Sequence, residues 1–172
     1  MDAEAFDEFY AASFRRLVGQ IYAMIGSHDE AQECVQEAFV RAWSHRRQLD
    51  DARSPEAWVR TTAYRLAVSR WRRTLRARRD PDRAVQHAGD VPGPSGDHVA
   101  LVRALEQLPE PQRRALVLHH LCDLSVADVA AETGAPEGTV KARLSRGRTA
   151  LQALMDDDND NDHDLTEGAT RA

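Results

Sequence analysis

The 172-residue sequence contains few of the residues that sheets, tight turns and disulfide frameworks require. It has only 9 Gly, 4 Phe, 3 Tyr and 3 Trp, whereas alanine and straight-chain residues abound. Straight-chain side chains lose little rotamer freedom in a helix, so this composition favours helices over sheets. The two cysteines, Cys34 and Cys122, are too few for a disulfide framework and are most simply small core residues, as in cytosolic proteins.

Long hydrophobic runs and targeting signals are also missing. No apolar run approaches the ~18 residues of a transmembrane helix, so no membrane span is predicted. The first ten residues, MDAEAFDEFY, are acidic and lack the basic and apolar regions of a signal peptide. We therefore expect a cytoplasmic protein.

The formal net charge of −5 hides an uneven distribution along the chain. Residues 53–79 hold nine Arg and one Glu, which gives this segment a charge of +8, while residues 1–52 and 80–97 are acidic. A local concentration of cations is the electrostatic footprint of a polyanionic partner. The distribution therefore favours nucleic acid as a partner, although the net charge is negative.

The chain divides into two blocks with helical periodicity, residues 1–79 and 98–155. Residues 80–97 contain three Pro and three Gly without an apolar period, which predicts a linker. Residues 156–172 begin with six Asp in nine positions and have too little apolar surface to fold, which predicts a disordered acidic tail. The expected fold is all-α, with two small helical domains joined by a flexible linker.

Three helices are expected in the first block. They are Ala3–Ile25, then Asp29–His45 with Asp29 as its N-cap, then a helix that opens at Ser54–Pro55 and ends near Arg79. Apolar residues of the second helix recur at intervals of three and four, so that helix has one buried face. Its opposite face carries Glu33, Gln36 and Glu37.

The second block predicts a helix-turn-helix. Helices are expected over residues 99–108, 110–122, 126–133 and 137–155, with Gly134 in the turn before the last one. The inward positions of the last two helices are Val129, Ala130, Val140, Leu144 and Leu151. The outward positions of the last helix form a cationic face suited to a DNA groove: Lys141, Arg143, Ser145, Arg146 and Arg148.

Polar residues in both blocks point to binding rather than to catalysis. Arginines around Trp71 can neutralise phosphates, and an exposed Trp71 ring can stack on an unpaired base, although core packing of this ring is the simpler alternative. Trp58 is expected in the core. Residues 33–37 offer either a solvated face or a docking face for a protein, because no histidine in register, Gly-rich loop or cleft-forming domain accompanies the carboxylates. The pair His119–His120 with Cys122 lacks the four ligands of a zinc site. We expect no catalytic residue, cofactor or metal.

Several sequence strings resemble extracytoplasmic-function sigma factors of the sigma-70 family. Residues 28–43 (HDEAQECVQEAFVRAW) resemble the region 2 helix of that family. Residues 108–113 (LPEPQR), 124–130 (LSVADVA) and 136–148 (PEGTVKARLSRGR) resemble region 4. The order of both blocks, with a linker between them, carries the resemblance. Within this family, the sequence most resembles the SigE-like group of actinobacteria.

The resemblance implies a role for each matching position. Residues that fall on the docking site for the β′ coiled coil of RNA polymerase are Glu33, Gln36 and Glu37. The Arg46–Ser54 loop falls where the family captures a flipped base. Residues that fall on the helix that reads and melts the minus-ten element are Tyr64, Arg65, Arg70, Trp71, Arg72 and Arg73. Residues on the minus-thirty-five recognition helix are Thr139, Lys141, Ala142, Ser145 and Arg146, with Arg143 and Arg148 near the DNA backbone. Tyr64, Arg65 and Ser69 depart from the family pattern, so the minus-ten preference cannot be transferred from a relative.

The resemblance implies a non-enzymatic factor that binds core polymerase, through the β′ coiled coil and the β flap, and directs it to promoters. An anti-sigma factor is a further partner that it allows. The 18-residue linker can span roughly 60 Å at ~3.3–3.6 Å per residue, enough for promoter elements about one and a half DNA turns apart. Three alternatives stay open: a helix-turn-helix repressor or activator with a dimerising or ligand-sensing first block, a helical adaptor that binds only protein, and an enzyme, which would need a polar pocket that the sequence does not indicate.

Overall fold

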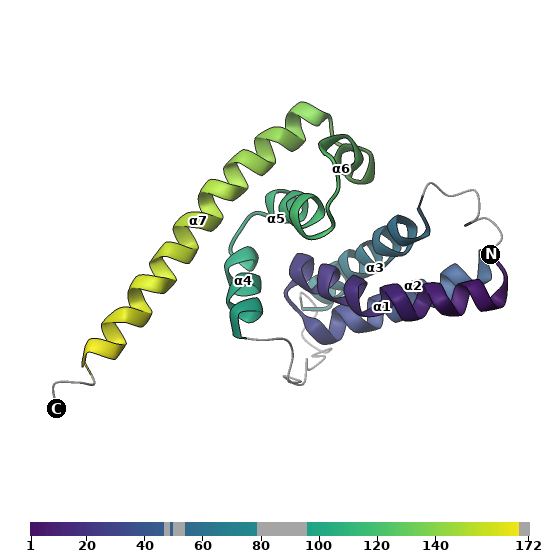
Figure 1. Ribbon diagram of the computed structural model, residues 1–172, viewed down its shortest axis with the longest axis horizontal. Helices are drawn as coiled ribbons and strands as arrows, with labels where there is room; N and C mark the ends of the chain where they lie inside the picture. Colours follow the sequence, from purple (N-terminus) through teal and green to yellow (C-terminus); the bar gives the residue numbers. More distant parts are fainter. Residues whose placement is uncertain (47–48, 50–53, 79–95, 169–172) are drawn as a thin grey trace. The chain divides into compact units, whose positions relative to one another are not determined.

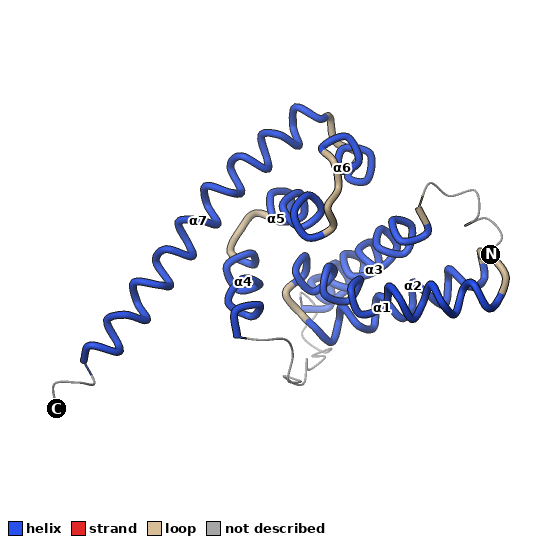
Figure 2. The backbone as a smooth tube through the Cα atoms, viewed as in Figure 1, coloured by secondary structure: helices blue, strands red, loops and turns tan. Residues whose placement is uncertain are grey.

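A computed structural model describes residues 1–46, 49, 54–78 and 96–168 of the chain. All regular structure in these residues is helical (Figures 1 and 2). The helices group into two compact units, Met1–Gly93 and Pro94–Ala172. The predicted all-α class with two small helical domains is therefore confirmed.

The first unit consists of α1 (Ala3–Ile25), α2 (His28–Ser44) and α3 (Pro55–Arg78). Helix α2 packs against both α1 and α3. Buried side chains recur at intervals of three and four along each helix, as expected for helices with one apolar face. They include Leu17, Ile21 and Met24 of α1, Ala31, Cys34, Val35 and Ala38 of α2, and Val59 and Ala63 of α3.

The connection between α1 and α2 explains where α2 begins. Gly26 adopts a left-handed conformation with φ of 78°, and its N–H donates to the Tyr22 carbonyl at 2.8 Å. Ser27 has an extended backbone, and its hydroxyl accepts the N–H of Glu30 at 3.4 Å. The N-cap of α2 is therefore Ser27, and the prediction of Asp29 was wrong. Asp29 lies in the first turn, where its negative charge interacts favourably with the positive end of the helix dipole.

The second unit begins with α4 (Gly96–Glu106) and α5 (Glu110–Leu116). Residues 79–95, most of the predicted linker, lie outside the described residues. Helix α5 passes into a π-helical turn, η1 (Val117–Leu121), which is wider than an α-helical turn. In it the N–H of Cys122 donates to the Val117 carbonyl five residues earlier at 3.1 Å. The prediction of one regular helix over 110–122 was therefore wrong beyond Leu116. The sequence carries no breaker at this point, so periodicity alone could not reveal the widening.

The second unit ends in the predicted helix-turn-helix, α6 (Val126–Thr133) followed by α7 (Glu137–Gly168). The Ser125 hydroxyl caps α6 by accepting the Asp128 N–H at 3.1 Å, and Gly134, with φ of 66°, ends it. Of the predicted inward positions Val129, Val140 and Leu144 are buried, whereas Ala130 and Leu151 are half-buried.

The predicted end of the last helix at Met155 was wrong, because α7 continues to Gly168. The helical backbone therefore includes residues 156–168 of the segment that was expected to be disordered. A formed helix adds one backbone hydrogen bond for each further residue, and neither Gly nor Pro occurs between Gly147 and Gly168. The low helix propensity of the aspartates does not end the helix.

Candidate functional site

Helix α2 presents the predicted acidic face opposite its buried face. Ala31, Cys34 and Ala38 face the core, and their spacing places Glu33 and Gln36 in solvent. The side chain of Glu33 is 68% exposed, and Glu37 is half-buried. The three residues expected to act together therefore lie on one side of one helix.

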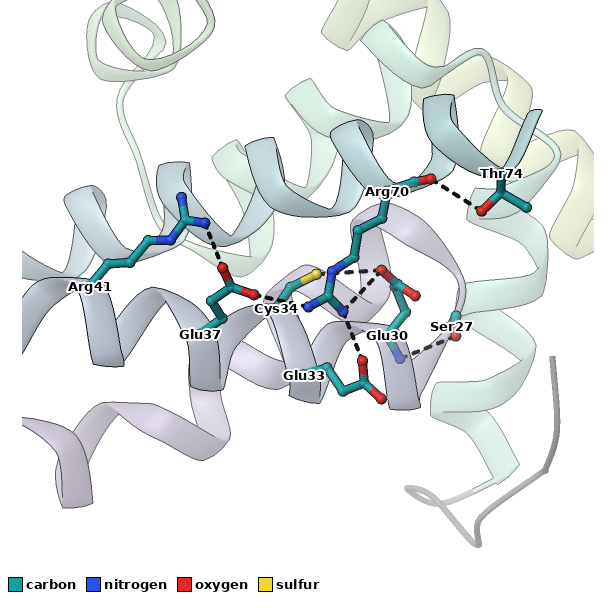
Figure 3. Close-up of polar contacts among 8 residues, drawn as sticks. All are labelled: Ser27, Glu30, Glu33, Cys34, Glu37, Arg41, Arg70 and Thr74. Atoms are coloured by element: carbon teal, nitrogen blue, oxygen red, sulfur yellow. Dashed lines mark hydrogen bonds and ion pairs between the residues drawn. The ribbon is translucent and has the colours of Figure 1, made fainter. Parts of the chain in front are cut away.

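Arg70 of α3 lies against this acidic face (Figure 3). Its guanidinium donates to Oε2 of Glu33 at 2.8 Å and to Oε2 of Glu37 at 3.0 Å. The same group pairs with Oε1 of Glu30 at 3.5 Å. A planar guanidinium has five donors in a fixed fork, which suits it to bridge several carboxylates. Arg70, expected among the DNA-binding residues, is therefore brought together with the predicted polymerase-binding residues.

Glu37 is the most engaged of the three carboxylates. Its Oε1 accepts from Arg41, one turn along α2, while its Oε2 accepts from Arg70. The hydrogen bond from Arg41, and then that from Arg70, lowers the pKa of Glu37. Each solvent-exposed pair of this kind contributes only ~0.2–1 kcal/mol. The network therefore fixes the positions of side chains more than it stabilises the fold.

Cys34 lies beneath this network and is fully buried. Its Sγ is 3.6 Å from Oε1 of Glu30. Burial raises the pKa of the Cys34 thiol to about 12. Because the thiolate is the reactive form, the thiol is inert at neutral pH, as expected for a core residue.

The exposed side of α3 carries most of the predicted minus-ten residues. Arg65, Trp71, Arg72 and Arg73 are exposed, and the Trp71 residue is 62% exposed. The alternative that Trp71 fills the core was therefore wrong, while Trp58, expected in the core, is half-buried beside His45. The structure leaves the Trp71 ring available for stacking.

Tyr64 does not share this exposed side. It is only 6% exposed, so its ring faces the core and cannot meet DNA in this conformation. Arg60, Ala63 and Ala67 are also buried, and with Tyr64 they follow an i, i+3, i+4, i+7 spacing. Reading this stripe from the sequence would have placed Tyr64 inside, but the buried arginine in it disguised the pattern.

Helix α7 presents the predicted cationic face. Lys141, Ala142, Ser145, Arg146 and Arg148 are exposed, whereas Thr139 and Arg143 are half-buried. The opposite side packs on α5, where Gly147 is buried. A Cβ at Gly147 would lie 2.9 Å from Cδ1 of Leu116, so this glycine permits the close approach of the two helices.

Three further features bear on the site. Most of the Arg46–Ser54 loop, expected to capture a base, lies outside the described residues, while the Arg46 guanidinium lies 4.3 Å from the Trp43 ring centroid. Among the described residues, no group of three or more His, Cys, Asp or Glu side chains is arranged to hold a metal ion. None of the helices described is both long and apolar enough to span a bilayer.

The bridge between α2 and α3 was not predicted from the sequence. Glu30, Glu33 and Glu37 are spaced i, i+3, i+7, so they form one acidic stripe on α2. Their spacing was available from the sequence. What the sequence could not supply is the packing of α3 that brings Arg70 to this stripe.

Comparisons with known proteins match both units. Residues 9–77 match sigma-70 region 2, and residues 98–151 match sigma-70 region 4. The chain is 33% identical over 174 residues to the RNA polymerase sigma-H factor of Pseudomonas aeruginosa, with 90% of this chain and 88% of that protein covered. It is 31% identical over 136 residues to the ECF RNA polymerase sigma factor EcfG of Rhodopseudomonas palustris, with 77% and 75% covered.

Among solved structures, the chain is similar to the sigma factor RpoE in its complex with the anti-sigma factor NepR from Bartonella quintana. The TM-score is 0.77 at 25% identity, with 90% of this chain and 98% of that chain covered. The similarity therefore extends over nearly the whole of both chains.

Proposed function

We propose a separate role for each exposed face, starting from the fact that the chain belongs to the extracytoplasmic-function group of the sigma-70 family. It is a sigma factor that binds core RNA polymerase and directs promoter-specific transcription initiation. The observation that carries the assignment of roles is that one chain presents an acidic face on α2 and cationic faces on α3 and α7. We further propose that the protein acts in the cytoplasm and performs no chemistry of its own.

The acidic face of α2 docks on the β′ coiled coil of the polymerase. Glu33 and Gln36 support this role because their exposed side chains can accept hydrogen bonds without any change in the core. Glu37 belongs to the same face, but its two oxygens already accept from Arg41 and Arg70. Direct contacts therefore come mainly from Glu33 and Gln36, and Glu37 holds the face together.

The exposed side of α3 binds the minus-ten element. Arg65, Arg72 and Arg73 neutralise phosphates, and Trp71 offers a ring on which an unpaired base stacks. Holding bases out of the stack costs a few kcal/mol each in base-flipping enzymes, so a stacking surface favours the open strand. The burial of Tyr64 supports a packing role for that residue instead of the contact first assigned to it.

Helix α7 reads the minus-thirty-five element in the major groove. Ala142, Ser145 and Arg146 share one exposed side and supply base contacts, with Lys141 and Thr139 beside them. Arg143 and Arg148 contact the DNA backbone. The β flap of the polymerase is the further protein partner that we assign to the second unit.

An anti-sigma protein is a regulatory partner that we also propose. The solved RpoE structure that resembles this chain is a complex with the anti-sigma factor NepR. A protein that covers the α2 face would prevent docking on the polymerase. Addition of such a partner should therefore reduce transcription in proportion to the fraction of the chain that it binds.

Run-off transcription tests the proposed function. Purified chain and core polymerase are incubated with promoter fragments from the host genome, with core polymerase alone as the control. We expect transcripts from a limited set of promoters only when the chain is present. Tight binding to a palindromic duplex without polymerase, and no specific transcript, would instead indicate the helix-turn-helix repressor.

A further inference from the structure

Arg70 differs in its surroundings from the neighbouring cations of α3. Its side chain is 26% exposed and contacts three carboxylates of α2, whereas Arg72 and Arg73 are exposed. None of the described acidic side chains pairs with Arg72 or Arg73. A phosphate that binds Arg70 would have to displace Glu33 and Glu37, and the carboxylates would also repel it. Arg70 is therefore poorly placed to contact DNA.

The acidic stripe, defined as Glu30, Glu33 and Glu37, needs a cation to hold its side chains close together. Like charges at i, i+3 and i+4 positions on a helix repel one another. The Arg70 fork reaches one oxygen of each carboxylate (Figure 3). It therefore relieves this repulsion and restricts the rotamers of Glu33 and Glu37.

We propose that Arg70 is a positioning residue for polymerase docking and not a promoter contact. This inference rests on the proposed docking role of α2. Arg70 acts through Glu33 and Glu37, whose side chains it holds in the arrangement that the partner binds. An ordered face loses less side-chain entropy on association, so binding is tighter than to the same residues when free.

The arrangement of acceptors identifies which group is left for the partner. In Glu37, Oε1 accepts a hydrogen bond from Arg41 and Oε2 accepts one from Arg70. Glu33 gives only Oε2 to Arg70, and its side chain is largely exposed. Its Oε1 therefore accepts from a donor of the polymerase while Arg70 keeps Oε2, so Arg70 stays in place in the complex.

The test separates polymerase affinity from promoter opening in the full-length chain. We compare Arg70→Ala with Arg72→Ala, which removes the same side-chain type from an exposed site two residues away. Affinity for core polymerase is measured by fluorescence anisotropy, and opening is measured with 2-aminopurine in the minus-ten element at saturating core. Arg70→Ala should weaken core binding by about tenfold, as loss of a preorganised docking face would, with opening restored once core is saturating. Arg72→Ala should keep its core affinity and reduce opening.

Two further variants distinguish positioning from a general loss of stability. Arg70→Lys keeps the charge, but a single ammonium cannot reproduce the fork, so it should weaken core binding by less than Arg70→Ala. If Arg70→Ala does not fold, Arg70→Lys is compared with Arg72→Ala instead, and it should bind core polymerase more weakly than Arg72→Ala while keeping promoter opening at saturating core. Glu37→Gln should weaken core binding in the native background and add little in the Arg70→Ala background, because the two residues act as one unit.

Two results would overturn this role of Arg70. Native core affinity in both Arg70 variants, with reduced opening at saturating core, would make Arg70 a DNA contact. Additive losses in Arg70→Ala and Glu37→Gln would show that the two residues act independently. Absence of core binding by the unmodified chain would instead refute the proposed function, and the inference would be withdrawn with it.

Discussion

The cations of the two units meet different surroundings. In the first unit, Arg70 pairs with the acidic stripe of α2, and Arg16 of α1 pairs with Glu56 of α3 at 2.6 Å. In the second unit, none of the described acidic side chains pairs with Lys141, Arg146 or Arg148 on α7. A cluster of arginines in a sequence therefore does not give the number of cations available to a polyanion. Packing partners decide which of them are already neutralised.

Overpacking the second unit should produce the largest difference in stability between the two units. Gly147→Val places a branched side chain where a single Cβ already lies 2.9 Å from Leu116, so we expect a destabilisation of ~1–3 kcal/mol. All three Trp residues, Trp43, Trp58 and Trp71, lie in the first unit. Tryptophan fluorescence in urea should therefore stay unchanged while the circular dichroism signal of the second unit is lost earlier.

The control for that change is Gly138→Ala on the same helix, where no atom lies within 4 Å of the added Cβ. It should not destabilise the protein, because alanine is the better helix former. Equal stability of the Gly147 and Gly138 variants would contradict the close packing of α5 on α7.

Arg146 and Arg148, which no described acidic side chain neutralises, test the proposed DNA binding by α7. Arg146→Ala should cost ~1–3 kcal/mol and relax the preference at one position of the upstream promoter element, as expected for a bidentate contact to a base edge. Arg148→Ala should weaken binding evenly across sequences. The measurement is promoter selection from a randomised library by the polymerase holoenzyme. Unchanged selection profiles in both variants would place DNA on another side of α7.

Charge reversal on the acidic face of α2, which pairs with Arg70, tests the proposed docking on the polymerase. Glu37→Lys combined with Gln36→Ala places a third cation beside Arg41 and Arg70, so it removes the network as well as the docking face. We expect core binding at least ~10-fold weaker, equivalent to ~1.4 kcal/mol, while the helical circular dichroism is retained. Glu8→Lys, the same charge change at an exposed site on α1, is the control. Similar co-elution of both variants with core polymerase would contradict the docking role.

The thiols should differ in reactivity with pH. Because burial raises the pKa of Cys34 to about 12, the thiol stays neutral in the native chain, and iodoacetamide at pH 8 should modify the half-buried Cys122 first. The raised pKa also means that the folded chain holds this proton more tightly than the unfolded chain. Its contribution to stability is complete below pH ~8.5, the ordinary thiol value, and falls as the pH rises toward 12. The modification of each thiol is measured by mass spectrometry. Rapid modification of Cys34 in the native chain would show that its site opens readily.

The acidic tail should have the smallest effect. Its six Asp residues between 156 and 164 allow two roles, a solubilising segment or a competitor of DNA for the cationic face of α7. Because the backbone continues as helix to Gly168, at 1.5 Å per residue Asp156 lies ~15 Å along the axis from Arg146, beyond the ~8 Å Debye length at physiological salt. Truncation after Met155 should therefore change promoter affinity little at physiological salt and raise it slightly at low salt. A large gain at physiological salt would support direct competition.

The sequence predicts the helices of this protein well where periodicity and capping residues agree. The first helix has the predicted bounds Ala3–Ile25, and Gly134 ends α6 as expected. Periodicity does not reveal the widened turn after Leu116, which depends on backbone hydrogen bonds to Val117 and Leu118. The end of α7 differs because helix continuation depends on the absence of a breaker more than on apolar content.

The site is only partly predictable for a related reason. The exposed positions of α2 and α7 follow from helical spacing within one element, and most of them lie as expected, although Arg143 of α7 is half-buried. The surroundings of Tyr64 and Arg70 depend on which side of α3 packs against α2, and an arginine-rich helix gives no clear apolar stripe from which to read this. Charge counts therefore identify the helix but not the residues on it that remain free.

Site-specific crosslinking tests directly whether the α2 face binds protein and the α7 face binds DNA. A photo-crosslinking amino acid is placed at Gln36 in one variant and at Ser145 in another, both exposed positions, and each is irradiated in the complex with core polymerase and promoter DNA. Crosslinks from position 36 to the β′ subunit and from position 145 to upstream promoter DNA are predicted. Crosslinks from position 36 to DNA, or from position 145 to protein alone, would contradict these two roles.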